Sequence, residues 1–155
     1  MPPRIFLADD HDIVREGVKF LLKARPNWIV CGEASNGKDA VLGVYASRPD
    51  VAVLDISMPE LSGLEAAKQI YQATPDVKIL FFTMHDSKSL MRAARDAGAR
   101  GLVLKSFAAR DLLRAIEMIL AGESFFESGD PKHMKHKEST RSPFLFLWRR
   151  SAIVI

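Results

Sequence analysis

The sequence of 155 residues lacks the features that mark secreted and membrane proteins. It contains a single cysteine, Cys31, so no disulfide can form within the chain, and a reducing compartment is expected. No apolar run is long enough to span a bilayer, and residues 1–4 lead straight into a short apolar run rather than a signal peptide. We therefore expect a cytoplasmic location and no membrane span.

The main part of the chain also lacks an excess of charge of one sign. The formal net charge is +3, but residues 1–128 hold 16 Lys and Arg against 17 Asp and Glu, whereas residues 129–155 hold 6 against 2. The basic excess lies at the C-terminal end, so the main part has no electrostatic footprint of a nucleic-acid-binding surface. With 48% hydrophobic and 26% charged residues, the composition is typical of a folded globular protein.

The chain contains an alternation of two patterns instead. Short apolar runs rich in β-branched residues predict buried strands at 5–8, 29–32, 51–54, 77–82 and 102–104. Between them apolar residues recur at helical spacing, first at Ile13, Gly17, Phe20 and Leu21. Five strand–helix repeats predict an α/β fold, in which a five-stranded parallel sheet carries helices on both faces.

The repeats end near residue 122, which suggests three parts of the chain. We expect a folded domain at 1–122, a linker at 123–142 and a short apolar and basic tail at 143–155, too short for a full output domain. His133 and His136 have no cysteine or carboxylate at ligand spacing, so a soft-metal site is not expected there.

Acidic, hydroxyl and basic residues follow the predicted strands, at the sheet edge where ligands bind in such folds. They are Asp9 and Asp10 after the first strand, Asp55 after the third, Thr83 at the end of the fourth and Lys105 after the fifth. Carboxylates gathered at one edge repel each other unless a cation neutralises them, and Mg²⁺ prefers oxygen ligands. With a cation bound, Asp55 can act as a nucleophile toward phosphorus.

These residues closely resemble those of the receiver domain of two-component response regulators, in a NarL/FixJ-like form. The motifs occur in the same order, namely Asp9-Asp10, Leu54-Asp55-Ile56-Ser57-Met58-Pro59, Gly63, Thr83-Met84-His85, Ala97-Gly98-Ala99-Arg100-Gly101 and Gly101-Leu102-Val103-Leu104-Lys105. The resemblance covers residues 4 to about 122. It implies a flavodoxin-like (βα)5 receiver fold with strand order 2-1-3-4-5.

The resemblance implies that Asp55 accepts a phosphoryl group from a sensor histidine kinase, with Mg²⁺ or Mn²⁺ as cofactor. Asp10, Asp55 and the backbone carbonyl of Ser57 would hold the metal, and Asp9 would act through water. Thr83 and Lys105 would bind the phosphoryl group and switch protein–protein interactions in transcriptional signal transduction. Beyond self-phosphotransfer and autodephosphorylation, no enzymatic activity is implied.

The resemblance also implies partners for the switched form. A homodimer can form through the face made by the fourth helix near 90–97, the fifth strand at 102–104 and the fifth helix near 112–120. DNA is expected as a partner only if the natural gene product carries a helix-turn-helix domain, since residues 123–155 show no such helices.

Two positions depart from the family pattern. Leu102 stands where an aromatic residue is common, so a switch through an aromatic rotamer is not expected. Ser106 stands where proline commonly follows the lysine, which leaves the isomer of the Lys105–Ser106 bond open. His11 and His85 border the acidic and hydroxyl positions, and we expect both to be ordinary solvated side chains.

Other interpretations remain open. Taken alone, Asp9 and Asp10 also suit a helix N-terminus. A degenerate receiver would act as a phosphorylation-independent interaction module. A phosphohydrolase of the haloacid dehalogenase class would need a second Asp where Ser57 stands, and a flavodoxin-like domain would hold a flavin phosphate that the acidic pair repels.

Overall fold

The computed structural model describes residues 1–126, so the predicted tail at 143–155 and most of the predicted linker at 123–142 lie outside the described part. The strands are β1 (Arg4–Ala8), β2 (Ile29–Ala34), β3 (Val51–Leu54), β4 (Lys78–Thr83) and β5 (Gly101–Leu104). The helices are α1 (Asp12–Leu22), α2 (Gly37–Ser47), α3 (Gly63–Ala73), α4 (Lys88–Asp96) and α5 (Ala108–Leu120), the last preceded by the short 3₁₀ helix η1 (Lys105–Phe107).

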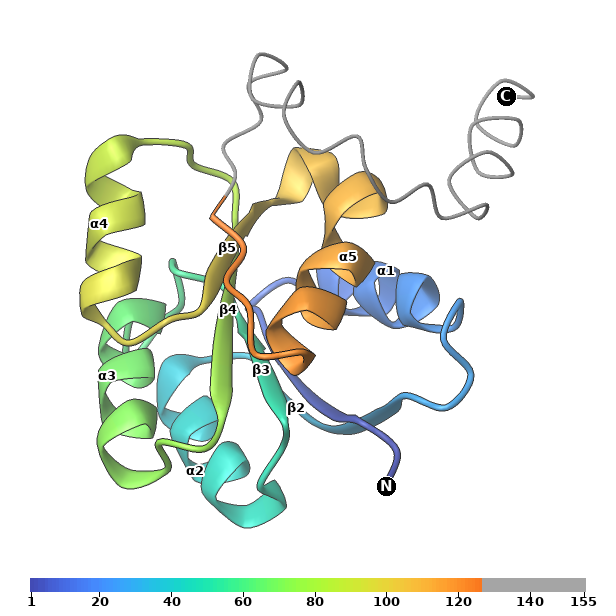
Figure 1. Ribbon diagram of the computed structural model, residues 1–155. Helices are drawn as coiled ribbons and strands as arrows, with labels where there is room; N and C mark the ends of the chain where they lie inside the picture. The colour runs from blue at the N-terminus through green and yellow to red at the C-terminus, as the bar shows by residue number, and fades with distance from the viewer. Residues whose placement is uncertain (127–155) are drawn as a thin grey trace.

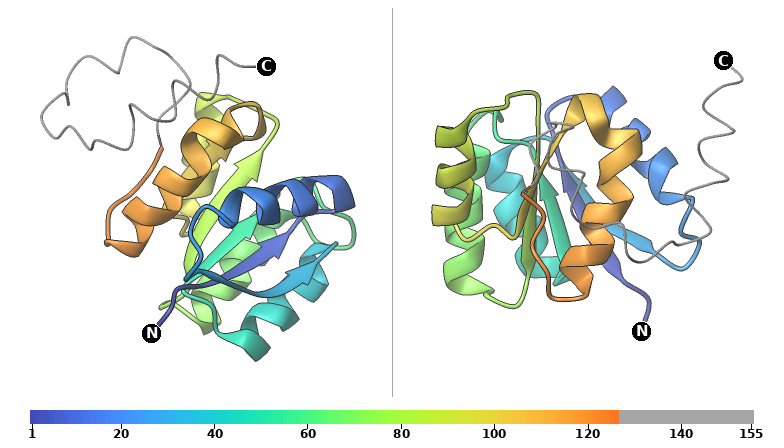
Figure 2. Two further views of the ribbon diagram at one scale, coloured as in Figure 1. Left: turned by 90° about the vertical axis from the view of Figure 1, so that its right-hand side faces the viewer. Right: turned by 45° about the horizontal axis from the view of Figure 1, so that its top comes forward.

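The five strands form one parallel sheet in the order β2-β1-β3-β4-β5. Helices α2, α3 and α4 cover one face of this sheet, and α1 and α5 cover the other (Figures 1 and 2). The α/β class, the helices on both faces and the strand order predicted from the sequence are confirmed. Strand β2 lies at one edge, which leaves Ile29 at its start 41% exposed.

Two apolar cores lie on either side of the sheet, and β1 contributes to both. Phe6 and Ala8 belong to the core under α2, α3 and α4, whereas Ile5 and Leu7 belong to the core under α1 and α5. Successive side chains of a strand point to opposite faces, so a strand covered on both faces must be apolar at every position. This is why the strand sequences read as continuous apolar runs.

Helix α1 buries a different stripe from the one that its spacing suggested. Ile13 and Phe20 are 86% and 72% exposed, while Val18 and Leu22 are buried against the sheet. The helix carries apolar residues on two adjacent stripes, and the stripe that contains Val18 and Leu22 is the one that fits the core.

The packed part of the chain continues past α5. Phe125 is only 1% exposed, and its backbone lies beside β5, accepting from the Leu102 N–H at 2.8 Å and donating to the Arg100 carbonyl at 2.9 Å. Figure 1 shows this segment in orange along β5. The guanidinium of Arg95 on α4 lies 3.9 Å from the ring centre of Phe126. The packed unit therefore reaches Phe126, beyond the boundary at 122 expected from the sequence.

Among the described residues, every helix is too short or too polar to cross a membrane.

Candidate functional site

The sheet topology brings four of the predicted site residues to one edge. Asp9 follows β1 and Asp55 follows β3, and these strands are neighbours with Ala8 opposite Leu54. Thr83 ends β4 opposite Leu104, the residue just before Lys105. Because all five strands are parallel, these positions share the carboxyl edge of the sheet.

A single ammonium group lies between two buried carboxylates at this edge. The Nζ of Lys105 is 2.6 Å from Oδ2 of Asp9 and 3.3 Å from Oδ2 of Asp55, and the three side chains are 9%, 6% and 6% exposed. One positive charge cannot neutralise two carboxylates in an environment that water hardly reaches. The cluster therefore has an unbalanced negative charge before Asp10 is counted.

This excess of negative charge affects the pKa of Asp55. Burial raises the pKa of Asp55 above its ordinary value of 3.8, and the charge of Asp9 raises it further. Lys105 and the backbone N–H of Ser57 favour the charged form and lower this pKa, but they do not cancel the increase. A cation bound beside Asp55 would restore the preference for the ionised carboxylate.

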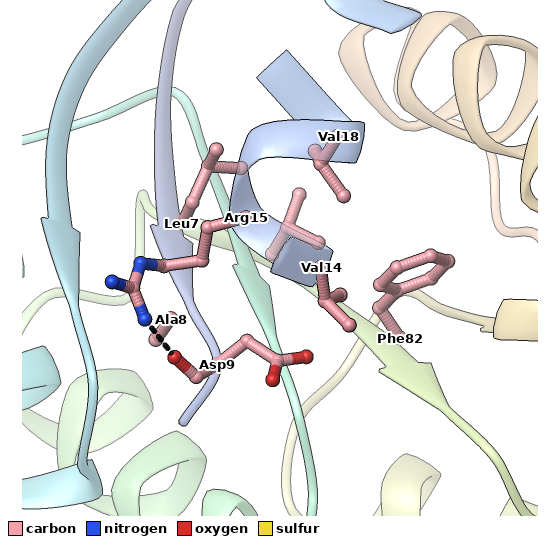
Figure 3. A pocket seen from close by; sticks show the side chains of 8 residues that line it. Leu7, Ala8, Asp9, Val14, Arg15, Val18 and Phe82 are labelled. Atoms are coloured by element: carbon pink, nitrogen blue, oxygen red, sulfur yellow. Dashed lines mark hydrogen bonds between the residues drawn. The ribbon is translucent and has the colours of Figure 1, made fainter. Parts of the chain in front are cut away.

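The backbone of Asp9 is held on both sides. Its N–H donates to the Ala34 carbonyl at 3.1 Å, and its own carbonyl accepts from Nη1 of Arg15 at 2.5 Å. Figure 3 shows the Arg15 side chain reaching this carbonyl from α1, while the Asp9 carboxylate points away from it. Arg15 also pairs with Asp12 and Glu33, so one guanidinium ties β1, α1 and β2 together.

Arg15 keeps its charge despite its position. Burial lowers the pKa of Arg15, but the hydrogen bonds and charges of Asp12 and Glu33 outweigh this effect and raise it overall. The guanidinium thus stays a permanent donor to Asp9. Leu7, Val14, Val18 and Phe82 line a small apolar hollow beside it, between the sheet and α1.

Asp10 and His11 form the outer rim of the cluster. The Nδ1 atom of His11 lies 3.0 Å from Oδ1 of Asp10 and 3.1 Å from Oδ1 of Asp9, although the His11 side chain is 65% exposed. The expectation of a solvated His11 describes its exposure but misses these contacts. Helix α1 begins at Asp12 with His11 as its N-cap residue, and His11 makes no side-chain capping bond.

The donor set fits a divalent cation. One possible ligand atom each from Asp9, Asp10, His11 and Asp55 lie within 4.8 Å of one another. Oδ2 of Asp9 is fully buried and accepts no hydrogen bond of good geometry from residues 1–126, although Lys105 lies beside it. Carboxylate oxygens crowded in this way are the ligands that hard cations prefer.

Glycines fix the loop that follows Asp55. The N–H of Gly63 donates to the Ile56 carbonyl at 2.8 Å, and a Cβ atom at Gly63 would lie 1.9 Å from the Asp55 carbonyl oxygen. Gly37 on α2 approaches the same loop, since a Cβ there would lie 1.9 Å from the Leu61 carbonyl oxygen. Met58 anchors the loop in the core. The loop therefore cannot move away from the sheet edge without losing this close packing.

Thr83 and Leu102 occupy buried positions on the neighbouring strands. Thr83 is 1% exposed, and its hydroxyl oxygen accepts from the backbone N–H of His85 at 3.3 Å. Leu102 is also 1% exposed and packs in the core under α4. The Lys105–Ser106 peptide bond, whose isomer the sequence left open, is trans.

The family follows from comparison with known proteins. The model of the response regulator receiver domain matches residues 5–117 of this sequence. The chain belongs to the response regulator receiver family. The resemblance to this family that we inferred from the motifs at the strand ends is confirmed.

The relatives of this receiver domain are transcriptional regulators of the NarL/FixJ subfamily. The DNA-binding transcriptional activator DevR/DosR of Mycobacterium tuberculosis is 39% identical over 125 residues, which cover 81% of this chain and 58% of DevR/DosR. The response regulator UvrY of Escherichia coli K12 is 36% identical over 150 residues, which cover 94% of this chain and 69% of UvrY. The chain thus spans 58% to 69% of the length of these two relatives.

Solved structures agree with this assignment. A LuxR-family two-component response regulator from Aurantimonas superposes with a TM-score of 0.79 at 39% identity, over 86% of this chain and 94% of that one. The isolated receiver domain of RcsB from Salmonella enterica serovar Typhimurium, determined with the phosphomimetic BeF3−, gives 0.76 at 27% identity, over 83% and 95%.

The roles of the individual residues in this receiver domain remain predictions. The structure places Asp9, Asp10 and Asp55 in one cluster with Lys105 beside it, and it places Thr83 on the adjoining strand. Sequence reasoning missed Arg15 and the contacts of His11. For Arg15 the available signal was its spacing of three residues from Asp12, which is typical of an ion pair on a helix.

Proposed function

We propose that the receiver domain accepts a phosphoryl group on Asp55 from a sensor histidine kinase, and that the new charge changes its protein partners. The observation that carries this proposal is the buried position of Lys105 between the carboxylates of Asp9 and Asp55. Such an ammonium stabilises charge that arrives on a phosphoryl group attached to Asp55.

In the proposed transfer, a carboxylate oxygen of Asp55 forms a bond to phosphorus as the bond from phosphorus to the kinase imidazole nitrogen breaks. The bonding electrons return to the imidazole, and the product is an acyl phosphate on Asp55. Lys105 Nζ, already 3.3 Å from Oδ2 of Asp55, can follow the negative charge onto the phosphoryl oxygens. Later attack by water would release phosphate and restore the carboxylate.

Thr83 is suited to bind the same group. Its hydroxyl oxygen accepts from the His85 N–H, so its own proton is free to be donated to a phosphoryl oxygen. Thr83 lies opposite Leu104 on β5. A movement of Thr83 toward the phosphoryl group would therefore change the packing of β5 and α4. Leu102 would respond through packing alone, since it has no hydroxyl group.

Asp10, Asp55 and the backbone carbonyl of Ser57 would hold Mg²⁺ or Mn²⁺, and Asp9 would act through water. When bound, the metal would neutralise charge on the transferred phosphoryl group. The raised pKa of Asp55 supports this assignment, because a nearby cation would keep the nucleophile ionised.

The face formed by α4, β5 and α5 is the proposed homodimer surface and output of the switch. We propose a cytoplasmic regulator of transcription, with DNA as a partner only if the natural gene product carries a helix-turn-helix domain. The division of the chain into a receiver domain, a linker and a tail stays a prediction, with the end of the receiver domain near Phe126 rather than at residue 122.

The test is the mass of the intact protein after incubation with Mg²⁺ and a small phosphodonor such as acetyl phosphate or phosphoramidate. We expect a gain of one phosphoryl group, which is absent in Asp55→Asn and in excess chelator. Asp76→Asn removes an exposed carboxylate from the turn before β4 and is the matched control, which should still be phosphorylated. An unmodified parent protein would favour the phosphorylation-independent interaction module instead, and release of phosphate from assorted phosphoesters would favour a phosphohydrolase.

A further inference from the structure

An imidazole lies among the carboxylates of the acidic cluster. Nδ1 of His11 is 3.1 Å from Oδ1 of Asp9 and 3.0 Å from Oδ1 of Asp10. One of the two ring nitrogens of His11 also lies within 4.8 Å of a carboxylate oxygen of Asp55. Nitrogen is thus present in a donor set for which the sequence suggested only oxygen.

The backbone holds this imidazole near the cluster. The N–H of His11 donates to Oδ1 of Asp9 at 2.9 Å, and the next residue begins α1. Arg15, one turn further along, binds the Asp9 carbonyl, so the start of α1 is tied to the end of β1 at two points. The His11 side chain is 65% exposed, which leaves the ring accessible to ions from solvent.

The nature of the ligands determines which cations such a site prefers. Mg²⁺ binds oxygen and gains little from imidazole, whereas Mn²⁺, Co²⁺ and Ni²⁺ bind imidazole nitrogen with increasing strength, and Zn²⁺ also accepts imidazole as a ligand. A carboxylate cluster without nitrogen would bind these cations with smaller differences in affinity. A nitrogen that already faces two of the carboxylates changes that preference.

We propose that Nδ1 of His11 is a metal ligand, which makes this a mixed oxygen and nitrogen site that holds first-row transition cations more tightly than Mg²⁺. This inference rests on the proposed function only in that Asp10, Asp55 and the Ser57 carbonyl hold a cation, with Asp9 acting through water. It adds a nitrogen ligand from this chain and predicts a cation preference that these oxygen ligands alone would not produce.

The experiment uses Mn²⁺ as the probe, with the whole chain and no phosphodonor, at a mildly alkaline pH, because metal ions compete with protons for their ligands. Pulsed electron paramagnetic resonance of bound Mn²⁺ detects a directly coordinated nitrogen. The dissociation constants of Mn²⁺ and Mg²⁺, the latter from competition, give the ratio of the two affinities. We expect nitrogen coupling in the parent protein that disappears when excess Mg²⁺ displaces the Mn²⁺.

The variant His11→Gln removes the nitrogen ligand and keeps a neutral polar side chain. We expect it to lose the nitrogen coupling and to lower the affinity for Mn²⁺ relative to Mg²⁺ by about 10-fold or more, since even groups that only orient a ligand contribute about 10- to 100-fold. His85→Gln is the matched control, because His85 borders the same edge but is not part of the cluster. The double variant His133→Gln, His136→Gln controls for the remaining histidines. Both controls should keep the signal and the ratio.

The outcomes separate this inference from the proposed function. If the parent protein binds both cations and His11→Gln leaves the nitrogen coupling and the affinity ratio unchanged, the role of His11 is contradicted while the metal site stands. Loss of the coupling in either control variant would also overturn it. If the parent protein binds neither cation, the metal site and with it the proposed function fail.

Discussion

The ammonium nitrogen of Lys105 lies 2.6 Å from Oδ2 of Asp9, and both side chains are more than nine-tenths buried. The same nitrogen lies 3.3 Å from Oδ2 of Asp55, so this one cation serves two carboxylates. Removing one partner of a buried ion pair lowers stability far more than removing a surface charge, because water cannot reach the remaining charge and take the place of the lost partner. The stability of the domain and its chemistry therefore depend on the same contact.

Replacement of Lys105 by Met should destabilise the metal-free domain. Two buried carboxylates would lose the one ammonium that pairs with them among residues 1–126, and we expect a loss of about 3 kcal/mol or more in the free energy of unfolding. Urea unfolding in the presence of chelator measures this loss. Lys68→Met is the matched control, since Lys68 is half-exposed on α3 and its substitution should change stability by less than about 0.5 kcal/mol. Equal stability of Lys105→Met and the parent protein would contradict the account.

Substitution of Asp55 by Asn should stabilise the metal-free domain at neutral pH. Because the folded-state pKa of Asp55 is raised above 3.8, the folded protein binds more protons than the unfolded chain between those two pKa values, and stability falls as the pH rises through this window. Asn carries no charge, so it escapes this loss. The advantage should disappear below pH 3.8, where the carboxyl group is protonated in both states.

The measurement is the free energy of unfolding of both proteins across this pH range in chelator. Asp76→Asn serves as the control, because Asp76 is exposed and its substitution should leave the pH dependence of stability unchanged. An Asp55→Asn protein that is less stable than the parent at neutral pH would contradict the claim that the charge of Asp55 destabilises the metal-free domain.

Two glycines should respond in opposite ways to alanine. In Gly63→Ala the new methyl group would meet the Asp55 carbonyl oxygen, so the loop must shift, and we expect a loss of about 1–3 kcal/mol together with weaker Mg²⁺ binding. In Gly17→Ala the methyl group meets nothing within 4 Å on the exposed face of α1, and we expect a gain of about 0.5–1 kcal/mol in the free energy of unfolding. Thermal unfolding with and without Mg²⁺ checks both; a tolerated Gly63→Ala would mean that the loop is not held against Asp55.

Phe125 should prove part of the folded unit although it lies beyond α5. Its side chain is 1% exposed, and Phe125→Ala should cost about 3–5 kcal/mol in the free energy of unfolding. Phe20→Ala, at a side chain that is 72% exposed, should change stability by less than about 0.5 kcal/mol. Denaturant unfolding compares the two, and similar small effects would place residues 123–126 outside the cooperative unit.

The strand ends could be predicted from the sequence because burial on both faces leaves a strong signal. A strand between two helix layers is apolar throughout, so the first charged residue after it marks the carboxyl edge of the sheet. Asp9, Asp55 and Lys105 were found in this way, and parallel pairing brought them together. Helix α1 had no comparable signal, because it offers two apolar stripes and only the packing against the sheet selects Val18 and Leu22 over Ile13 and Phe20.

Contacts that depend on how a chain turns could not be predicted in this way. The segment around Phe125 is held along β5 by backbone hydrogen bonds to Arg100 and Leu102. Such bonds leave no pattern of side chains in the sequence from which they could be predicted. The placement of His11 between Asp9 and Asp10 depends on the turn that starts α1, and the same sequence in an extended segment would send successive side chains to opposite sides.

The most direct test of the central claim identifies the atom that receives the phosphoryl group. The protein is incubated with Mg²⁺ and acetyl phosphate, treated with borohydride, which reduces an acyl phosphate of aspartate to homoserine, and digested for peptide mass spectrometry. The account predicts homoserine at position 55 and unmodified aspartate at positions 9 and 10. Homoserine at another position, or none at position 55 in a protein that has gained a phosphoryl group, would contradict it.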